Sequence, residues 1–316
     1  MSTEVYATPM TPNEVSMAVE SGPTAAIEAP EPTAITAPVI EWFAENARDL
    51  PWRRSDCSPW GVLVSEFMLQ QTPVSRVLEP WRRWLDRWPT PEALALEPAG
   101  EAVRAWGRLG YPRRALRLHA AAVAIGERHD GQVPEDHAEL LALPGVGEYT
   151  AAAVASFAYA RAHPVLDTNV RRVLARVFSG TEFPPPAPTV AERALARRVM
   201  PEEEAATWAA ASMELGALVC TATNPRCDAC PVVQACRWVA LGRPAHDGPP
   251  RRGQAYAGTD RQVRGLLLQV LREHEGPVPQ HRLDIVWPDA TQRARALESL
   301  LADGLVRTSG DAFRLP

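Results

Sequence analysis

Four cysteines late in the chain form its densest group of metal-binding side chains. Cys220, Cys227, Cys230 and Cys236 follow the spacing C-x6-C-x2-C-x5-C within 17 residues. Thiolates so close in sequence can surround one compact, soft metal centre, either a zinc ion or a [4Fe–4S] cluster. Zinc sites usually contain two C-x2-C pairs, and only one is present here, so the spacing favours the cluster. A disulfide framework fits less well, because no signal-peptide pattern opens the sequence and a chain of this size does not need cross-links.

Composition restricts the chemistry that the other residues can perform. All 33 basic residues are arginine, so no lysine amine is available to form a Schiff base. The net charge of −5 arises near the N-terminus, where residues 1–38 hold five glutamates and no basic residue, and the other 33 acidic residues balance the arginines. A neutral remainder is compatible with an arginine-rich face for phosphate. The isolated Cys57 is expected to be an ordinary thiol.

The chain is expected to be mainly α-helical and to hold two or three domains. Its 316 residues are 46% apolar and can bury a large core, and no run of about 18 apolar residues predicts a membrane span. Apolar spacing predicts helices over the following segments: 39–48, 59–71, 73–87, 91–96, 99–107, 112–128, 136–141, 147–159, 168–178, 189–199, 203–219, 231–240, 260–274, 280–286 and 289–303.

The composition also indicates where the ordered regions end. Residues 1–37 are rich in Pro, Ala, Thr and Glu and are predicted to form a disordered acidic tail. Residues 242–258 are rich in Gly, Pro and Arg and are predicted to be a linker. Residues 259–316 combine helices with two short extended segments, 305–308 and 313–315, but no strand is predicted before residue 300. This pattern predicts a small C-terminal winged-helix-like module.

A glycine-rich turn joins two of the predicted helices in LPGVGEYTAAAVASFAY, residues 143–159. Glycine at positions 145 and 147 allows backbone angles that other residues resist. A turn of this kind can direct amide N–H groups toward a phosphate oxygen at the start of a helix. By itself, the turn could equally be a plain helix–helix connector.

Two carboxylates occupy positions where function and structure compete as explanations. Glu66 lies within an apolar helical run, so it either faces solvent or is held in a dry pocket that would raise its pKa and suit it to act as a general acid. Asp167 precedes a predicted helix, where aspartate is most often a simple N-cap. The helix dipole would also keep its carboxylate ionised, as is needed beside a developing cation.

Together these motifs resemble the endonuclease III superfamily of DNA glycosylases, with its helix–hairpin–helix turn, downstream aspartate and cysteine loop. Within it, four segments resemble the MutY family of adenine DNA glycosylases: SEFMLQQT (65–72), GRLGYPRRA (107–115), LPGVGEYTA (143–151) and LDTNVRRVLAR (166–176). The resemblance covers roughly residues 39–240. It implies a two-lobed helix–hairpin–helix glycosylase fold over 38–241, with a six-helix lobe at about 59–165 and a cluster lobe from 38–58 and 166–241. It also implies that the cysteines hold a [4Fe–4S] cluster.

The resemblance further implies the roles of the catalytic residues. MutY-like enzymes rotate adenine out of duplex DNA, where it lies opposite 8-oxoguanine or guanine, and hydrolyse its N-glycosidic bond. Glu66 matches the general acid that protonates adenine at N7, and Asp167 matches the carboxylate that stabilises the oxocarbenium-like sugar. Asn169 and Tyr149 match polar residues of the same pocket, and Arg53 matches a residue near the adenine.

Contacts to DNA are implied for a second group of residues. Gln71 and Tyr111 match side chains that enter the duplex around the lesion and fill the space left by the extruded base. Arg226 matches the basic residue that cysteine loops of this type present to phosphate. The other expected contacts come from the segment beside Gln71 and from the hairpin: Gln70, Thr72, Leu143, Gly145, Val146 and Gly147.

Two other functions are alternatives to monofunctional adenine excision. Endonuclease III itself nicks the strand with a lysine just after the GVG turn, but Tyr149 holds that position and the chain has no lysine. Base removal by water, leaving an intact abasic site, is therefore predicted. An iron–sulfur DNA-binding regulator would need neither Glu66 nor Asp167.

The sequence departs from many MutY proteins after the linker. Their largely β, Nudix-like domain and its Phe-Ser-His signature for 8-oxoguanine are absent, and residues 259–316 are predicted to be mainly helical. We hypothesise that this module contacts the duplex near the oxidised base; a packing or partner-binding appendage is the alternative. The expected partner is duplex DNA with A:8-oxoG or A:G mispairs. The protein is expected to be a monomer in the bacterial cytoplasm, at the nucleoid, without membrane contact.

Overall fold

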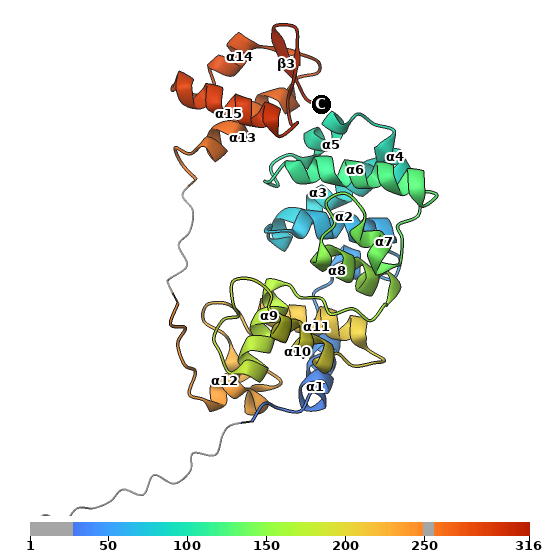
Figure 1. Cartoon of the computed structure of the whole chain (residues 1–316), viewed down its shortest axis with the longest axis vertical. Helices are drawn as coiled ribbons and strands as arrows, with labels where there is room; N and C mark the ends of the chain where they lie inside the picture. The colour runs from blue at the N-terminus through green and yellow to red at the C-terminus, as the bar shows by residue number, and fades with distance from the viewer. Residues whose placement is uncertain (1–27, 249–255) are drawn as a thin grey trace, which may run out of the picture.

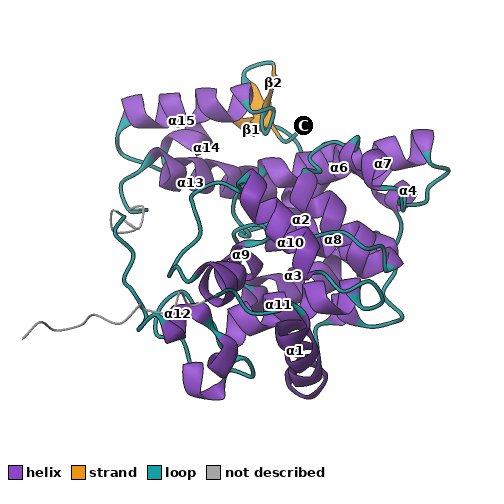
Figure 2. Ribbon diagram, turned by 60° about the horizontal axis from the view of Figure 1, so that its bottom comes forward, coloured by secondary structure: helices purple, strands orange, loops and turns teal. Residues whose placement is uncertain are grey.

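The computed structural model describes residues 28–248 and 256–316, and helices dominate both ranges (Figures 1 and 2). The α-helices are α1 (Thr33–Asn46), α2 (Pro59–Leu69), α3 (Val74–Arg87), α4 (Pro91–Ala95), α5 (Ala99–Trp106), α6 (Arg113–Arg128), α7 (His137–Leu141), α8 (Glu148–Tyr159), α9 (Thr168–Leu174), α10 (Val190–Val199), α11 (Ala205–Leu218), α12 (Arg237–Ala240), α13 (Asp260–Glu273), α14 (Gln280–Asp284) and α15 (Ala290–Ala302). Shorter turns are η1 (Pro51–Arg53), η2 (Ala175–Ser179), η3 (Cys227–Ala229) and η4 (Val233–Ala235), and the strands are β1 (Val278–Pro279), β2 (Arg307–Ser309) and β3 (Ala312–Arg314). None of the described helices is long and apolar enough to cross a membrane.

The first core gathers around α2, which is buried on nearly all sides. Ser58 caps the helix by accepting a hydrogen bond from the backbone N–H of Gly61, and Pro59 fits the first helical position, where no N–H is required. The helix packs against α3, α6 and α8. Because α2 is apolar on every face, a carboxylate on it must enter a dry environment, and this helix carries Glu66.

A second core combines the first helix with helices from the C-terminal half of the glycosylase-like region. Ile35 and Val39 on α1 pack with residues of α9, η2, α11 and α12, although more than 130 positions separate them in sequence. Figure 1 shows this group, with α1 and α9–α12, below the helices α2–α8. A chain that returns in this way leaves a cleft where its two cores meet, and the candidate site lies there.

The C-terminal module contains three helices and one small sheet. The strand order is β1-β3-β2, with both pairs antiparallel. The predicted helices and the β2–β3 hairpin are confirmed, whereas the expectation of no strand before residue 300 was wrong, because β1 pairs Val278 with Phe313. β1 has only two residues, too few to produce an alternating pattern.

The other predicted helices are confirmed, with differences at their ends. α1 begins at Thr33 and not at 39, so it takes in the last residues of the predicted tail. It also contains Pro38, past its first turn, whose missing N–H leaves the helix one hydrogen bond short. The predicted helix 168–178 is α9 followed by the π-helical turn η2, and 231–240 contains only η4 and α12 because Cys236 interrupts it. Residues 1–27 of the tail and 249–255 of the linker lie outside the described residues.

Candidate active site and cysteine pocket

One pocket between the two cores brings the predicted catalytic residues together. Its lining includes Arg53 from η1, Glu66 from α2, Tyr149 from α8, and Asp167 and Asn169 at the start of α9. The pocket holds about 1460 Å³ of space, its open mouth included, which is ample for a small organic group. The residues come from segments up to 116 positions apart, from Arg53 to Asn169, and only the fold gathers them.

Glu66 is a buried acid poised near neutrality. Glu66 is only 4% exposed, and burial raises the pKa of its carboxyl group from 4.5 to about 7. A hydrogen bond from the Tyr149 hydroxyl lowers this pKa, and the nearby charge of Asp167 raises it. Among the described residues, Oε2 of Glu66 has no hydrogen-bond partner. A buried acid with a free oxygen in a pocket can deliver a proton to a bound group.

Asp167 caps α9 and also faces the pocket. Its Oδ1 accepts a hydrogen bond from the backbone N–H of Val170 at 2.6 Å, and its Oδ2 accepts one from Nδ2 of Asn169 at 2.8 Å. Burial raises the pKa of Asp167, while these two donors and the charge of Arg172 oppose that rise. The N-cap and the functional explanations are therefore compatible, because the capping geometry presents the carboxylate to the pocket.

The charges of these two acids act on the hydroxyl group of Tyr149. Burial first, and then the charges of Glu66 and Asp167, raise the pKa of its phenol well above 10. The phenol therefore stays protonated at neutral pH and can only donate or accept a hydrogen bond. A phenol cannot act as an amine nucleophile.

Glu214 lies behind the pocket, bound to the pocket residue Arg53, and sequence reasoning missed it. It lies on α11, is fully buried, and binds Arg48 through Nε and Nη2 at 2.7 Å each and Arg53 through Nη2 at 2.9 Å. Burial alone would raise the pKa of Glu214, but the hydrogen bonds from Arg48 and Arg53 outweigh it and lower the pKa to about 2. Glu214 thereby holds Arg53 at the pocket, where its Nη1 is buried without a partner among the described residues.

The signal for Glu214 was present in the sequence. It is an acid within the apolar helical run AATWAAASMELGAL, as Glu66 is within its own run. The argument that singled out Glu66 also applies to Glu214: a carboxylate among apolar residues must be exposed, neutral or paired. Its arginine partners lie 161 and 166 positions earlier, so no local spacing announces the pair.

The four cysteines line one small pocket next to α9, together with apolar side chains and Arg176. Nη1 of Arg176 lies 3.4 Å from Sγ of Cys220. Burial raises the pKa of the Cys230 thiol to about 11, so it stays protonated at neutral pH unless a cation draws the proton away. No three His, Cys, Asp or Glu side chains in the described ranges are arranged to hold a single metal ion. Four thiols on one pocket are the donor set that a zinc ion or a [4Fe–4S] cluster would require.

Arg172 connects the cysteine loop to the candidate active site. Its Nε donates to the carbonyl oxygen of Cys220 at 2.7 Å, and its Nη2 donates to Oδ1 of Asn169 at 2.8 Å. Asn169 in turn donates to Asp167. The position of the carboxylate thus depends on the shape of the loop that the four cysteines define.

The predicted helix–hairpin–helix turn joins α7 to α8. Gly145 has φ +79°, and a Cβ there would lie 2.6 Å from Cβ of Arg117, so glycine is required on both counts. Gly147 is the N-cap residue of α8. Leu143 and Val146 are buried, so their side chains pack into the core and any contact of theirs with phosphate must come from the backbone. An outward-facing turn of this kind suits phosphate.

Gln71 and Tyr111 lie outside the catalytic pocket and line a second groove. Both have left-handed backbone angles, φ +52° and +47°, which are uncommon for such side chains and concentrate at functional sites. Buried Arg114 fixes the backbone beside both: it donates to the carbonyl oxygens of Gln70 at 2.6 Å and of Gly110 at 3.2 Å. Tyr111 is 51% exposed, as a side chain that enters a duplex must be.

Two further residues predicted to contact DNA form hydrogen bonds within the protein. Thr72 is buried, accepts a hydrogen bond from Nη2 of Arg114, and lines the catalytic pocket. Arg226 is exposed in the cysteine loop, where its Nε donates to the carbonyl oxygen of Leu218 at 3.1 Å. Both remain predictions as DNA contacts.

Comparison with known proteins decides the family. Residues 64–201 match the model of the HhH-GPD superfamily base excision DNA repair protein family. An adenine DNA glycosylase of Mycobacterium tuberculosis is 52% identical over 297 residues, an alignment that covers 91% of this chain and 97% of the relative. The chain belongs to the adenine DNA glycosylase family. Another member of that family, from Mycolicibacterium smegmatis, is 54% identical over 274 residues, which are 86% of this chain and 92% of the relative.

Solved structures confirm the fold of this adenine DNA glycosylase family member. A non-covalent endonuclease III–DNA complex superposes with a TM-score of 0.56 at 23% identity, covering 65% of this chain and 92% of that chain. At this identity the likeness shows the mainly helical endonuclease III fold and nothing about substrate.

Proposed function

We propose that the protein is a monofunctional adenine DNA glycosylase, which hydrolyses the N-glycosidic bond of adenine opposite 8-oxoguanine or guanine in duplex DNA. The observation that carries the proposal is the buried Glu66 carboxyl group, with its pKa near 7 and an unpartnered oxygen, in one pocket with Asp167. A regulator that only binds DNA would have no use for this costly arrangement. The family membership and its named relatives support the same activity.

In the proposed reaction, the adenine enters the pocket only after it has left the base stack. The protonated carboxyl group of Glu66 gives its proton to N7 of adenine, and the Glu66 carboxylate remains. The C1′–N9 bond then breaks, and its electron pair leaves with the base. The Tyr149 hydroxyl, bonded to Glu66, orients the acid. Proton delivery of this kind contributes about 10²–10⁴-fold to rate.

The deoxyribose left behind is an oxocarbenium-like cation. The Asp167 carboxylate stabilises it, and the donors Asn169 and Val170 hold that carboxylate in place. Water adds to C1′ and releases a proton, so the product is an abasic site in an intact strand. Arg53, held by Glu214, is placed to contact the base.

The decisive experiment is incubation with a duplex that contains adenine opposite 8-oxoguanine. Strand breakage is expected only after alkali, because the chain has no lysine side chain to form a Schiff base at the sugar. Borohydride added during the reaction should trap no protein–DNA adduct. Breakage without alkali, or a trapped adduct, would show a lyase. An intact strand after alkali would remove the glycosylase proposal altogether.

The pH dependence of excision should report the state of Glu66. The acid works only when it is protonated, so kcat/KM is expected to fall above pH about 7, by about tenfold per pH unit. The rate should also fall at acid pH as Asp167 is protonated. Initial rates between pH 5 and 9 at constant ionic strength would measure both limbs. A rate that stays flat from pH 7 to 9 would contradict the assignment of Glu66 as the acid.

The same proposal assigns a [4Fe–4S] cluster to Cys220, Cys227, Cys230 and Cys236. When bound, such a cluster would fix the loop that carries Arg226 and the Arg172 link to Asn169. A brown colour on purification, with iron and sulfide in equal amounts, would distinguish the cluster from zinc. The proposed boundaries are residues 33–241 for the glycosylase region, which include all of α1, and 259–316 for the winged-helix-like module.

A further inference from the structure

The second groove lies between the glycosylase region and the C-terminal module. One wall is the loop Gly107–Pro112 together with Gln71, and the other is the face of α13 that carries Arg261, Gly265 and Gln269. These three α13 residues follow the helical spacing i, i+4, i+8, so they share one face. The groove holds about 1700 Å³ of space, its mouth included. We call it the module groove.

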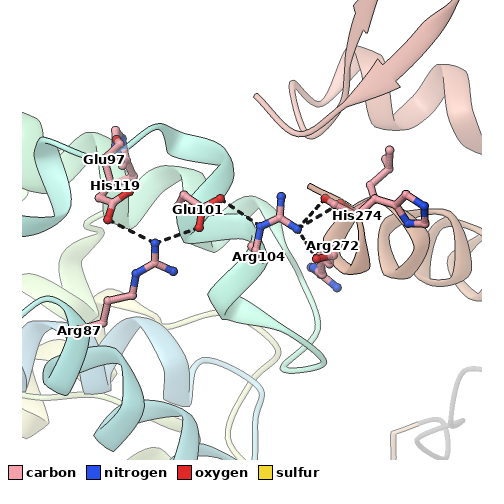
Figure 3. A network of polar contacts seen from close by, with 8 residues as sticks. Arg87, Glu97, Glu101, Arg104, His119, Arg272 and His274 are labelled. Atoms are coloured by element: carbon pink, nitrogen blue, oxygen red, sulfur yellow. Dashed lines mark hydrogen bonds and ion pairs between the residues drawn. The ribbon is translucent and has the colours of Figure 1, made fainter. Parts of the chain in front are cut away.

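The two walls of the module groove are held together by specific contacts. Arg104 on α5 reaches the end of α13, where its Nη1 donates to the carbonyl oxygen of His274 at 3.0 Å and to that of Arg272 (Figure 3). In return, Nε of Arg272 donates to the carbonyl oxygen of Val103 at 2.9 Å. Glu101 accepts from Nε of Arg104 at 3.0 Å and orients it. A guanidinium that satisfies the last carbonyls of a helix makes α13 a fixed wall.

The chain end reinforces this attachment. The backbone N–H of Gly100 donates to the carbonyl oxygen of Pro316 at 2.8 Å, and a Cβ at Gly100 would lie only 2.4 Å from that oxygen. Leu268 and Leu271 of α13 belong to the same apolar core as the helices of the first lobe. The module is thus packed on the glycosylase region, and these contacts fix the two walls of the groove relative to each other.

The charge of the groove suits a nucleic acid strand. Six arginines line it, and its only acidic lining residue is Glu273. On the other side of the module, Arg293 pairs with Asp284 and Arg295 with Asp260. The basic residues of α15 are therefore neutralised within the module. Within the groove, Arg104 and Arg264 also pair with carboxylates, Glu101 and Asp303, and the exposed arginines that can meet a phosphate are Arg76, Arg108 and Arg261.

The position of the groove indicates which strand it receives. Gln71 and Thr72 are adjacent in sequence, yet Thr72 lines the catalytic pocket and Gln71 lines the groove, and the two cavities share no lining residue. The segment around Gln71 therefore forms a ridge between them. If adenine enters the catalytic pocket on one side, the base that it leaves unpaired lies on the other side.

We infer that the module groove binds the strand opposite the adenine, at the unpaired base and its neighbouring phosphates, and that α13 supplies the module's contacts. This inference rests on the proposed function for the identity of the substrate. It gives residues 259–316 a role in opposite-base recognition. Arg261 and Arg108 face the phosphates from the two walls, and Gln269 and Tyr256 are the polar and aromatic groups within reach of a base.

Gly265 offers a way to test the groove without disturbing the fold. It lies in the middle of α13, and a Cβ there would meet only the Tyr256 hydroxyl, at an ordinary 3.4 Å. Gly265→Leu should therefore fill the groove while making the helix itself more stable. Gly126→Leu is the control, because Gly126 is an exposed glycine in the last turn of α6 with nothing within 4 Å and lines neither cavity.

The measurements are duplex binding by fluorescence anisotropy and single-turnover excision, with adenine opposite 8-oxoguanine and opposite guanine. Gly265→Leu is expected to weaken binding of both duplexes at least tenfold and to change the ratio of the two excision rates, whereas Gly126→Leu behaves as the wild type. Arg261→Ala should lower the slope of log affinity against log salt by about 1. Thermal unfolding confirms that each variant is folded.

The possible outcomes separate this inference from the proposed function. If the wild type excises adenine and Gly265→Leu binds and cuts as the wild type does, the groove inference is wrong and the function stands. If the wild type excises no adenine but Gly265→Leu still binds duplex more weakly, the groove binds DNA and the function is wrong. If binding weakens but the ratio of excision rates is unchanged, the opposite-base role is overturned.

Discussion

Glu66→Gln is expected to abolish nearly all adenine excision, with a loss of about 10²–10⁴-fold in the single-turnover rate. Glutamine has the shape of glutamate and can still bond to Tyr149, but it has no proton to give to the base. Duplex binding should be unchanged, because Glu66 is buried and its partners in the pocket remain. Rates at saturating enzyme, with anisotropy on the same duplex, would separate chemistry from binding.

The same variant should be at least as stable as the wild type above pH 7. The folded pKa of Glu66 is raised, to about 7, so the folded protein holds this proton more tightly than the unfolded chain does. Its contribution to stability is full below pH about 4.5 and is lost as pH rises through 7. Glutamine escapes that loss, so the melting temperature of Glu66→Gln at pH 8 should equal or exceed that of the wild type.

Glu79→Gln serves as the control, because Glu79 is an exposed residue of α3 that pairs with Arg83 on the surface. It should change neither excision nor melting temperature measurably. Full activity of Glu66→Gln would contradict the proposed mechanism. A lost activity that comes with a lower melting temperature at pH 8 would instead point to a folding defect.

Local chemistry explains why so much of the site could be predicted from sequence. Gly145 favours glycine because its backbone φ angle is positive, so the turn carries a visible signature. Glu66 can be singled out because a carboxylate is rarely buried in an apolar helix unless it is paired or functional. Asp167 is visible because N-caps have strong residue preferences. In each case the cause lies within a few positions of the residue.

The features that were missed depend on contacts between distant segments. Glu214 and Arg53 are 161 positions apart, and Arg104 reaches backbone carbonyls about 170 positions away. A carbonyl oxygen is present in every residue, so no side-chain pattern can predict that Arg104 will cap α13. The module groove arises from this docking. The residues that carry the role proposed for residues 259–316 could therefore be named only from the structure.

Asp167→Asn is the second variant with a large expected effect, and it isolates the charge from the cap. Asparagine is as good an N-cap as aspartate, so the bond to the backbone N–H of Val170 can persist and α9 should remain folded. The negative charge beside the oxocarbenium-like sugar is lost. Removal of one such electrostatic contact costs about 10²–10³-fold in rate, and that loss is expected in single-turnover excision.

The capping explanation makes a different prediction for the same residue. If Asp167 served only as an N-cap, Asp167→Asn would be nearly silent, and Asp167→Ala would lose about 1 kcal/mol of stability together with some activity. Asp289→Asn is the matched control, since Asp289 caps α15 through the backbone N–H of Gln292 in the C-terminal module. Both variants keep their N-caps, and only residue 167 faces the pocket. A large loss of excision in Asp167→Asn at an unchanged melting temperature would therefore show that the negative charge of Asp167, and not its capping role, supports catalysis.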